Sequence, residues 1–325
     1  GFKIEDYLID YAQNEGIAST LCSYHKNFIG GVDSGVLPKA AMSVTTSMIC
    51  DGNINTFRHM EQKHQVESYV LDIPNTYSPE AERYVVGQLQ ELIELLETKT
   101  GQMLDMNELQ AAIQRENEAK GYYKAFLKEQ KHRYYPNTMT LDLYMLFASH
   151  LNIGTRETLD FFKCLAEDVK TYPEFDGKGI LWVHLMPYYQ ETLQQYMNYQ
   201  EKYYIQACDL NLDYMEPLDA AHPLEALAKK MILNIYNGPY ERKVEMIRHL
   251  VKEFQSDAVI HFCHWGCKQS SGGVMLLKEA MREENVPMLI LDGDALDRRN
   301  SHDGQIKTRL QAFLELIDNI EEDKD

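Results

Sequence analysis

The chain has 325 residues, of which 44% are hydrophobic and 25% charged, so it is long enough to bury a core and to divide it between two domains. This composition excludes intrinsic disorder and a collagen-like protein. The 32 basic and 50 acidic side chains give a net charge of −18, which repels phosphate polyanions and argues against a nucleic-acid partner. No apolar run approaches the roughly 20 residues of a membrane helix, and the first ten residues do not resemble a signal peptide. We therefore expect no membrane partner and a cytoplasmic location.

The N-terminal half predicts an α/β domain with a helical extension. Strands are expected over 41–46 and 67–72, with a helix over 54–64 between them. Ser78 followed by Pro79 predicts the start of the next helix, because Ser is a favoured N-cap and Pro suits the first helical position.

Helices are expected to dominate the chain from 105 to about 170. The chain begins with Gly rather than Met, so we expect its true N-terminus to be missing.

The C-terminal half alternates short apolar segments with amphipathic ones, as βαβ units do. The expected strands are 179–184, 203–207, 257–262 and 288–291. The expected helices are 189–199, 224–236, 241–254, 273–284 and 305–320. This alternation predicts a doubly wound parallel sheet. Pro and two Gly interrupt the pattern at 171–179, so we place the domain boundary there, with an N-terminal domain over 1–172 and a C-terminal domain over 173–325.

The six cysteines are too few to form a disulfide framework in a chain of this length. Cys164 and Cys208 lie in apolar stretches and are expected to be ordinary buried thiols. Cys22 precedes a segment that ends in paired glycines, Cys50 follows the strand at 41–46, and Cys267 follows the strand at 257–262. Ligand-binding loops of parallel sheets gather at the carboxyl ends of strands, so these thiols are candidates for one metal centre.

The residues alone leave the chemistry of these cysteines open. Cys263-His264-Trp265-Gly266-Cys267 offers sulfur and imidazole for zinc, but the chain has no second cysteine pair to close a structural tetrahedron. Cys263 and Cys267 are also compatible with a redox pair, and each cysteine taken singly with an incidental thiol. Three dispersed thiolates suit an iron-sulfur cubane whose fourth iron is open to a substrate.

Spaced sequence blocks resemble those of the 2-hydroxyacyl-CoA dehydratase family, which also contains benzoyl-CoA reductase subunits. The blocks are Leu21-Cys22-Ser23-Tyr24, Ile49-Cys50-Asp51-Gly52, His261 to Gln269, Leu291 to Arg299 and Gly304-Gln305. The resemblance implies two doubly wound, Rossmann-like or flavodoxin-like domains, with a helical segment between them and a [4Fe-4S] cluster in the interdomain cleft. It assigns Cys22, Cys50 and Cys267 as the cluster ligands, whereas Cys263 has no assured counterpart in the family and is a candidate for an extra ligand. It also implies that the first strand region of the N-terminal domain is truncated in this chain.

The resemblance also implies a mechanism and partners. A homologous dehydratase subunit and an ATP-dependent iron-sulfur activator protein are expected, and an (R)-2-hydroxyacyl-CoA loses water through a ketyl radical after one-electron reduction. The chain has no Gly-x-x-x-x-Gly-Lys-Ser/Thr loop, so ATP is expected to be hydrolysed elsewhere. The alternatives are a benzoyl-CoA reductase-like subunit, a homodimer with a double cubane that reduces small molecules, and a partner subunit whose cluster only relays electrons.

Four other features each allow a functional and a structural interpretation. The basic stripe Lys120, Lys124 and Lys128, with Lys131 and Arg133, suits either coenzyme A phosphates and the activator or a solvated helix face. His264 and Trp265 suit either a pocket wall or loop packing. Ser270 to Gly273 suit either an anion site or an N-cap, and Asp292, Asp294 and Asp297 suit either a ligand site or turn formation.

Overall fold

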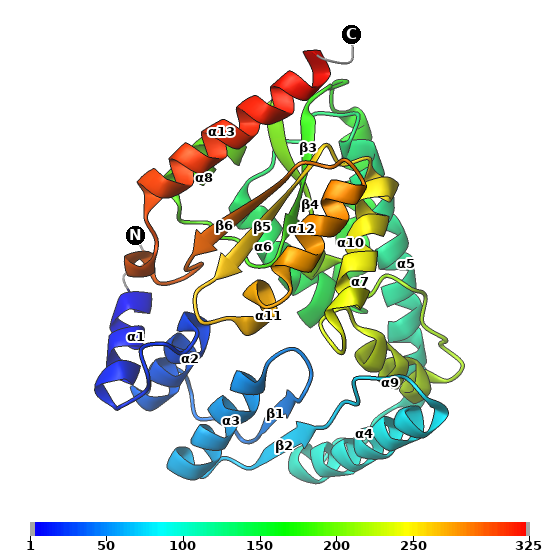
Figure 1. Ribbon diagram of the computed structural model, residues 1–325. Coiled ribbons are helices and arrows are strands. Elements are labelled where there is room, and N and C mark those ends of the chain that lie inside the picture. Colours follow the sequence, from blue (N-terminus) through cyan, green and yellow to red (C-terminus); the bar gives the residue numbers. More distant parts are fainter. Residues whose placement is uncertain (1–3, 323–325) are drawn as a thin grey trace. The chain divides into compact units, whose positions relative to one another are not determined.

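The computed structural model describes residues 4–322, which form two compact units. Unit 1 combines Gly1–Gln110, Leu218–Pro239 and Trp265–Gln269. Unit 2 combines Ala111–Pro217, Tyr240–His264 and Ser270–Asp325. Each unit is described by itself, and its elements are labelled in Figure 1.

Unit 1 is built around a short parallel pair of strands. Its elements are α1 (Ile4–Asn14), α2 (Ser23–Asp33), β1 (Ser43–Thr46), α3 (Asp51–His64), β2 (Ser68–Leu71), α4 (Pro79–Thr100) and α9 (Pro223–Leu233). β1 and β2 pair in register from Ser43 opposite Ser68 to Thr46 opposite Leu71. The Ser78 side chain accepts a hydrogen bond from the Ala81 amide at 3.1 Å, and Gly101 ends α4 with φ 69°. The predicted strand–helix–strand order and the Ser78 cap are therefore confirmed.

The apolar core of unit 1 joins segments that lie far apart in the chain. Leu71 of β2 and Val85 and Leu92 of α4 pack with Ala228 and Ile232 of α9. α9 lies between β4 and β5 in sequence, yet it buries its apolar face against α4 in unit 1.

Unit 2 holds the larger sheet and its covering helices. Its helices are α5 (Met106–Gln130, whose first turn belongs to unit 1), α6 (Met139–Leu146), a π-helix (Phe147–Leu151), α7 (Arg156–Asp168), α8 (Glu191–Met197), α10 (Tyr240–Phe254), α12 (Val274–Glu283) and α13 (Asp303–Glu322). Its strands are β3 (Lys178–Val183), β4 (Tyr203–Cys208), β5 (Ala258–His264) and β6 (Met288–Gly293). The short helix α11 (Lys268–Ser271) follows β5.

The strands of unit 2 are parallel in the order β4-β3-β5-β6. The chain runs outward from β3 to β4 and then returns to the other side of β3 with β5. β3 and β5 therefore flank the point where the strand order reverses, and open α/β sheets bind ligands outside the carboxyl ends of such strands. The loop that carries Cys267 leaves β5 at this end.

Both faces of this sheet are buried. Leu181, Val183 and Val259 pack against α5, α7, α10 and α12. Trp182 and Phe262 alternate with these residues, so they point to the opposite face, where both are fully buried and stack on each other. In Figure 1, α8 and α13 lie on that side.

The structure confirms the predicted strands but not every other predicted feature. All six expected strands are present, the sheets are parallel, and the Asp105–Lys170 stretch is mainly helical, so an α/β fold with parallel sheets is confirmed. The division of the chain at residue 172 and the interdomain position of the site remain predictions. No helix among residues 4–322 combines the length and the apolar character needed to cross a membrane.

The prediction that Cys164 is buried was wrong. Its thiol is exposed on α7, whereas Phe162 and Leu165 of the same helix are buried. The helical period places Phe162 and Leu165 on one face, so Cys164 between them points outward even in an apolar stretch. Cys208 is buried in β4 as expected.

Replacing Gly273 by Ala should destabilise unit 2. A Cβ at Gly273 would lie 2.2 Å from Cγ of the Tyr240 ring, so we expect the Gly273→Ala variant to lose about 1–3 kcal/mol of unfolding free energy through overpacking. Gly121→Ala on α5 is the control, because a Cβ there meets no described atom within 4 Å and a better helix former should add about 0.5–1 kcal/mol. Equal stability of the two variants in urea titrations would contradict this packing role.

Candidate functional site

Each of the three predicted cysteine ligands stands directly before a helix. Cys22 is the N-cap of α2, Cys50 is the N-cap of α3, and Cys267 precedes Lys268, the first residue of α11. Unpaired backbone N–H groups and the helix dipole at such positions favour a negatively charged sulfur. The sequence interpretation missed α2, because its residues 23–33 mix aromatic, charged and glycine residues without a clear apolar stripe.

A glycine brings the loop of Cys267 against the backbone of Cys22 within unit 1. A Cβ on Gly266 would lie 2.8 Å from the Cys22 nitrogen and 2.9 Å from the Thr20 carbonyl oxygen. Gly266 also has φ 74°, a left-handed conformation that favours glycine. Sequence position 267 is therefore held next to position 22 by a contact that only a residue without a side chain allows.

Cys50 is linked to both neighbouring segments. Its Sγ lies 3.5 Å from Nε2 of His25, which is three residues beyond Cys22 on α2. Burial raises the pKa of the Cys50 thiol, backbone N–H groups of Gly52 and Asn53 oppose this, and the nearby Cys267 thiolate raises it further. The structure therefore gathers the segments of all three predicted ligands in unit 1, with Cys22 buried and Cys50 and Cys267 half-buried.

The geometry around these thiols differs from that of a single-ion site. All six cysteines, which lie within residues 4–322, are thiols rather than disulfides. No group of three or more His, Cys, Asp or Glu side chains in the described chain is arranged around one metal ion. In a cubane, each cysteine binds a different iron atom, so its ligands stay farther apart than the ligands of one ion. Three cysteine thiols are the kind of donor set that an iron-sulfur cubane takes, so the chemistry of these residues suits such a group.

A buried carboxylate fixes α2 to α3 and so positions Cys22 relative to Cys50. The Asp33 side chain is fully buried and accepts hydrogen bonds from His59 at 3.0 Å, Lys63 at 2.9 Å and His64 at 2.7 Å. Burial raises the pKa of Asp33, but the hydrogen bonds from His64, Lys63 and His59 outweigh it and lower the pKa below the ordinary value. Asp33 ends α2, and its three partners lie in the last turns of α3.

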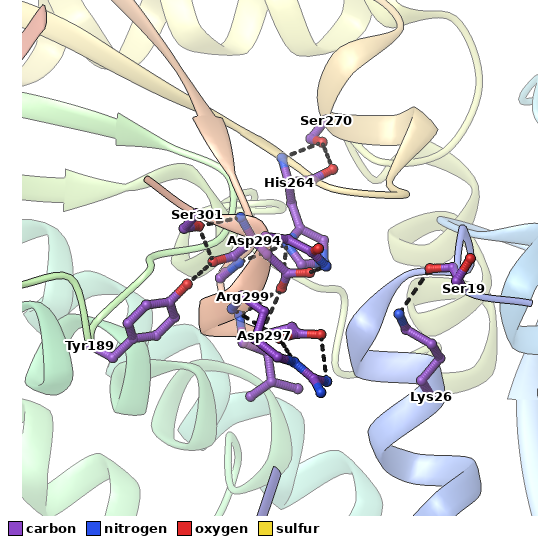
Figure 2. A network of polar contacts seen from close by, with 12 residues as sticks. Ser19, Lys26, Tyr189, His264, Ser270, Asp294, Asp297, Arg299 and Ser301 are labelled. Carbon is purple, nitrogen blue, oxygen red and sulfur yellow. Dashed lines mark hydrogen bonds and ion pairs between the residues drawn. The ribbon is translucent and has the colours of Figure 1, made fainter. Parts of the chain in front are cut away.

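A buried lysine orders the segment that leads to Cys22. Lys26 of α2 is fully buried, and its Nζ donates a hydrogen bond to the Ser19 carbonyl oxygen at 2.9 Å. Figure 2 shows this side chain turned back toward Ser19. This hydrogen bond holds the segment 19–22 against the first turn of α2.

Cys263 has other surroundings. It is buried in β5 of unit 2, with its Sγ 3.7 Å from Nδ1 of His261 and 4.0 Å from the Ser270 carbonyl oxygen. Its predicted part as an extra ligand remains a prediction.

The aspartates after β6 form a turn. Asp294 Oδ1 accepts hydrogen bonds from the Leu296 and Asp297 amides, each at 2.9 Å, and Figure 2 shows the surrounding network. His264 Nδ1 accepts a hydrogen bond from the Ala295 amide at 2.9 Å, which joins the end of β5 to this turn. The turn-forming interpretation of Asp294 is therefore confirmed, and His264 supports the loop.

The other singled-out features are also mainly structural. Within α5, Lys120 pairs with Glu116, while Lys128 and Lys131 pair with Glu253 and Asp257 of unit 2. Trp265 is 50% exposed, and its two interpretations, a pocket wall or loop packing, stay predictions.

This arrangement of a parallel α/β fold with cysteines at loop ends agrees with an independent finding on the sequence. Residues 2–317 match the model of the family described as "2-hydroxyglutaryl-CoA dehydratase, D-component". The chain belongs to this family of enzyme subunits, as its sequence blocks predicted.

Individual relatives are distant but extend over almost the whole chain. The alpha subunit of (R)-phenyllactyl-CoA dehydratase from Clostridium sporogenes is 24% identical, over 95% of this chain and 80% of the relative. The alpha subunit of (R)-2-hydroxyisocaproyl-CoA dehydratase from Clostridioides difficile is 24% identical, over 96% and 81%. One of the subunits of benzoyl-CoA reductase from Thauera aromatica is 19% identical, over 94% and 79%.

Replacing Asp33 by Asn should loosen the connection between α2 and α3. We expect a loss of about 1–3 kcal/mol, because hydrogen bonds from charged partners to a buried carboxylate are removed. The folded-state pKa of Asp33 is lowered, so its contribution is present above the unfolded pKa and lost as pH falls through the folded pKa. The stability difference between wild type and Asp33→Asn, measured by denaturant unfolding, should thus be present above the unfolded Asp pKa and shrink as pH falls through the folded pKa. A difference that grows on acidification would contradict this assignment.

Proposed function

We propose that this chain is a subunit of an iron-sulfur (R)-2-hydroxyacyl-CoA dehydratase in which Cys22, Cys50 and Cys267 hold a [4Fe-4S] cluster. The observation that carries the proposal is the meeting of these three cysteine segments in unit 1, through Gly266 on Cys22 and His25 on Cys50. Membership of the dehydratase family and the names of the relatives support it.

The residues around the three thiols suit a reaction that water would disturb. Ile49 and Trp265 are large apolar side chains, 46% and 50% exposed, and they come just before Cys50 and Cys267 in the chain. We assign these side chains, which flank two of the three cysteines, to shielding the site from water. Cys263, whose Sγ lies 3.7 Å from Nδ1 of His261 and 4.0 Å from the Ser270 carbonyl oxygen, stays a candidate for an extra ligand.

Cys22, Cys50 and Cys267 would hold the cluster, which would supply one-electron reduction of the thioester carbonyl, so that the neighbouring hydroxyl leaves through a ketyl radical. This chain binds and orients the acyl-CoA and keeps water out. In this proposal a separate ATP-dependent activator protein delivers the electron, as the resemblance to the dehydratase family implies.

A homologous subunit completes the enzyme in this proposal. The relatives from Clostridium sporogenes and Clostridioides difficile are named alpha subunits, which supports a heteromeric assembly.

Substitution of the ligands tests the cluster. After anaerobic purification or reconstitution, the wild-type chain should hold about four irons and four sulfides, and Cys22→Ala, Cys50→Ala and Cys267→Ala should each lose most of this iron. Cys164→Ala and Cys208→Ala are matched controls that should retain it, since these thiols lie on α7 and β4 of unit 2. Equal iron content in all five variants, or zinc in place of iron, would refute the assignment.

The reaction is tested on the anaerobic complex purified with its partner subunit and activator. Phenyllactyl-CoA, lactoyl-CoA and 2-hydroxyisocaproyl-CoA serve as probes, and we expect ATP-dependent formation of the corresponding enoyl-CoA from the (R)-enantiomer of at least one. Reduction of benzoyl-CoA without any dehydration would instead favour the reductase and overturn the proposal.

A further inference from the structure

We infer that His25 is a positioning residue that donates a hydrogen bond from Nε2 to the Cys50 sulfur and raises the reduction potential of the bound cluster. This inference rests on the proposed function. It assigns a role to a residue outside the ligand set that none of the sequence blocks singles out.

The contact is built from two helices of unit 1. His25 is in the first turn of α2, and Cys50 caps α3, with 3.5 Å between Nε2 and Sγ. The other ring nitrogen, Nδ1, lies 2.9 Å from Oγ1 of Thr56, one and a half turns into α3. Thr56 is buried, 3% exposed, so the imidazole is held at both nitrogens by residues of the same neighbouring helix.

The chemistry of a metal-bound thiolate decides the direction of these hydrogen bonds. Such a sulfur has no proton to give, so it can only accept, and Nε2 must carry the hydrogen. In a neutral ring with its proton on Nε2, Nδ1 accepts, and the Thr56 hydroxyl must therefore donate to it. The thiolate thus sets the tautomer, and Thr56 holds the ring in place by donating to Nδ1.

A glycine leaves the space for this contact. A Cβ on Gly52 would lie 2.7 Å from Nε2 of His25 and 3.2 Å from Sγ of Cys50, so any larger residue would push the ring away from the sulfur. The requirement for glycine at this position is steric, since the close atoms are those of the proposed hydrogen bond.

A hydrogen bond to a ligand sulfur acts on the potential through charge. Reduction adds a negative charge that spreads onto the thiolates, and a donor aimed at one of them stabilises the reduced form more than the oxidised form. Loss of the donor should therefore lower the potential and make reduction by the activator less favourable.

The test is a potentiometric titration of the reconstituted chain followed by electron paramagnetic resonance. We expect His25→Ala to lower the midpoint potential by the equivalent of about a tenfold change in the reduction equilibrium, or ~59 mV for one electron. Thr56→Val, which keeps the size of the side chain but removes the donor to Nδ1, should lower it in the same direction by less. Thr56→Ser, which keeps a hydroxyl donor, should have the wild-type midpoint potential. The control is His249→Gln, because His249 is an exposed residue of α10 in unit 2 and pairs with Glu253 instead of a cysteine.

The outcomes separate this inference from the proposed function. A wild-type chain that binds no cluster would overturn the proposed function itself. A full complement of iron with unchanged potential in His25→Ala and Thr56→Val would overturn only the role of His25. If His25→Ala loses its iron, Thr56→Val decides, because it retains the imidazole; loss of iron in both would assign His25 to cluster retention and overturn its effect on the potential.

Discussion

The candidate site depends on one close approach, that of the Gly266 backbone to the backbone of Cys22. A side chain at position 266 would overlap the Cys22 nitrogen and the Thr20 carbonyl, so the absence of a Cβ lets two distant parts of the chain touch. More than two hundred residues separate them, and closing so long a loop has an entropic cost that grows only slowly with its length. The packing of α9 on α4 offsets part of this entropic cost, because it brings the chain back to unit 1 before β5 begins.

Helix beginnings give the site its electrostatic character. Cys22 and Cys50 cap α2 and α3, and the Asp33 network joins the far ends of the same two helices. The negative C-terminal end of the α3 dipole thus lies near His59, Lys63 and His64. The positive N-terminal ends of α2 and α3 lie at Cys22 and Cys50. This separation of charge along two helices is suited to holding an anionic group without a cluster of basic residues around it.

Sequence reasoning succeeded where the pattern is local and failed where the tertiary structure decides. Strands β3 to β6 were predicted because buried parallel strands are short continuous apolar runs, and the cysteine blocks revealed the family. α2 was missed, since Gly30 and Gly31 weaken the helical pattern. The structure explains Gly30, because a Cβ there would overlap the backbone of Leu8. Burial of Cys164 was predicted from its apolar neighbours without regard to the helical period.

His25 was also missed, and only one signal pointed to it: a histidine three residues after a cysteine lies on the adjacent turn if the segment is helical. Its contact with Cys50 depends on α3 packing beside α2, which no local pattern encodes.

The discontinuity of unit 1 has a consequence for biosynthesis. Cys22 and Cys50 leave the ribosome early, but at roughly 5–20 residues per second the segments that complete their surroundings follow many seconds later. During translation the nascent chain therefore carries two unprotected thiols without the third. Incorporation of any shared inorganic cofactor has to wait until residue 267 has been made and docked, which makes maturation a late event and leaves the early thiols exposed to oxidants in the meantime.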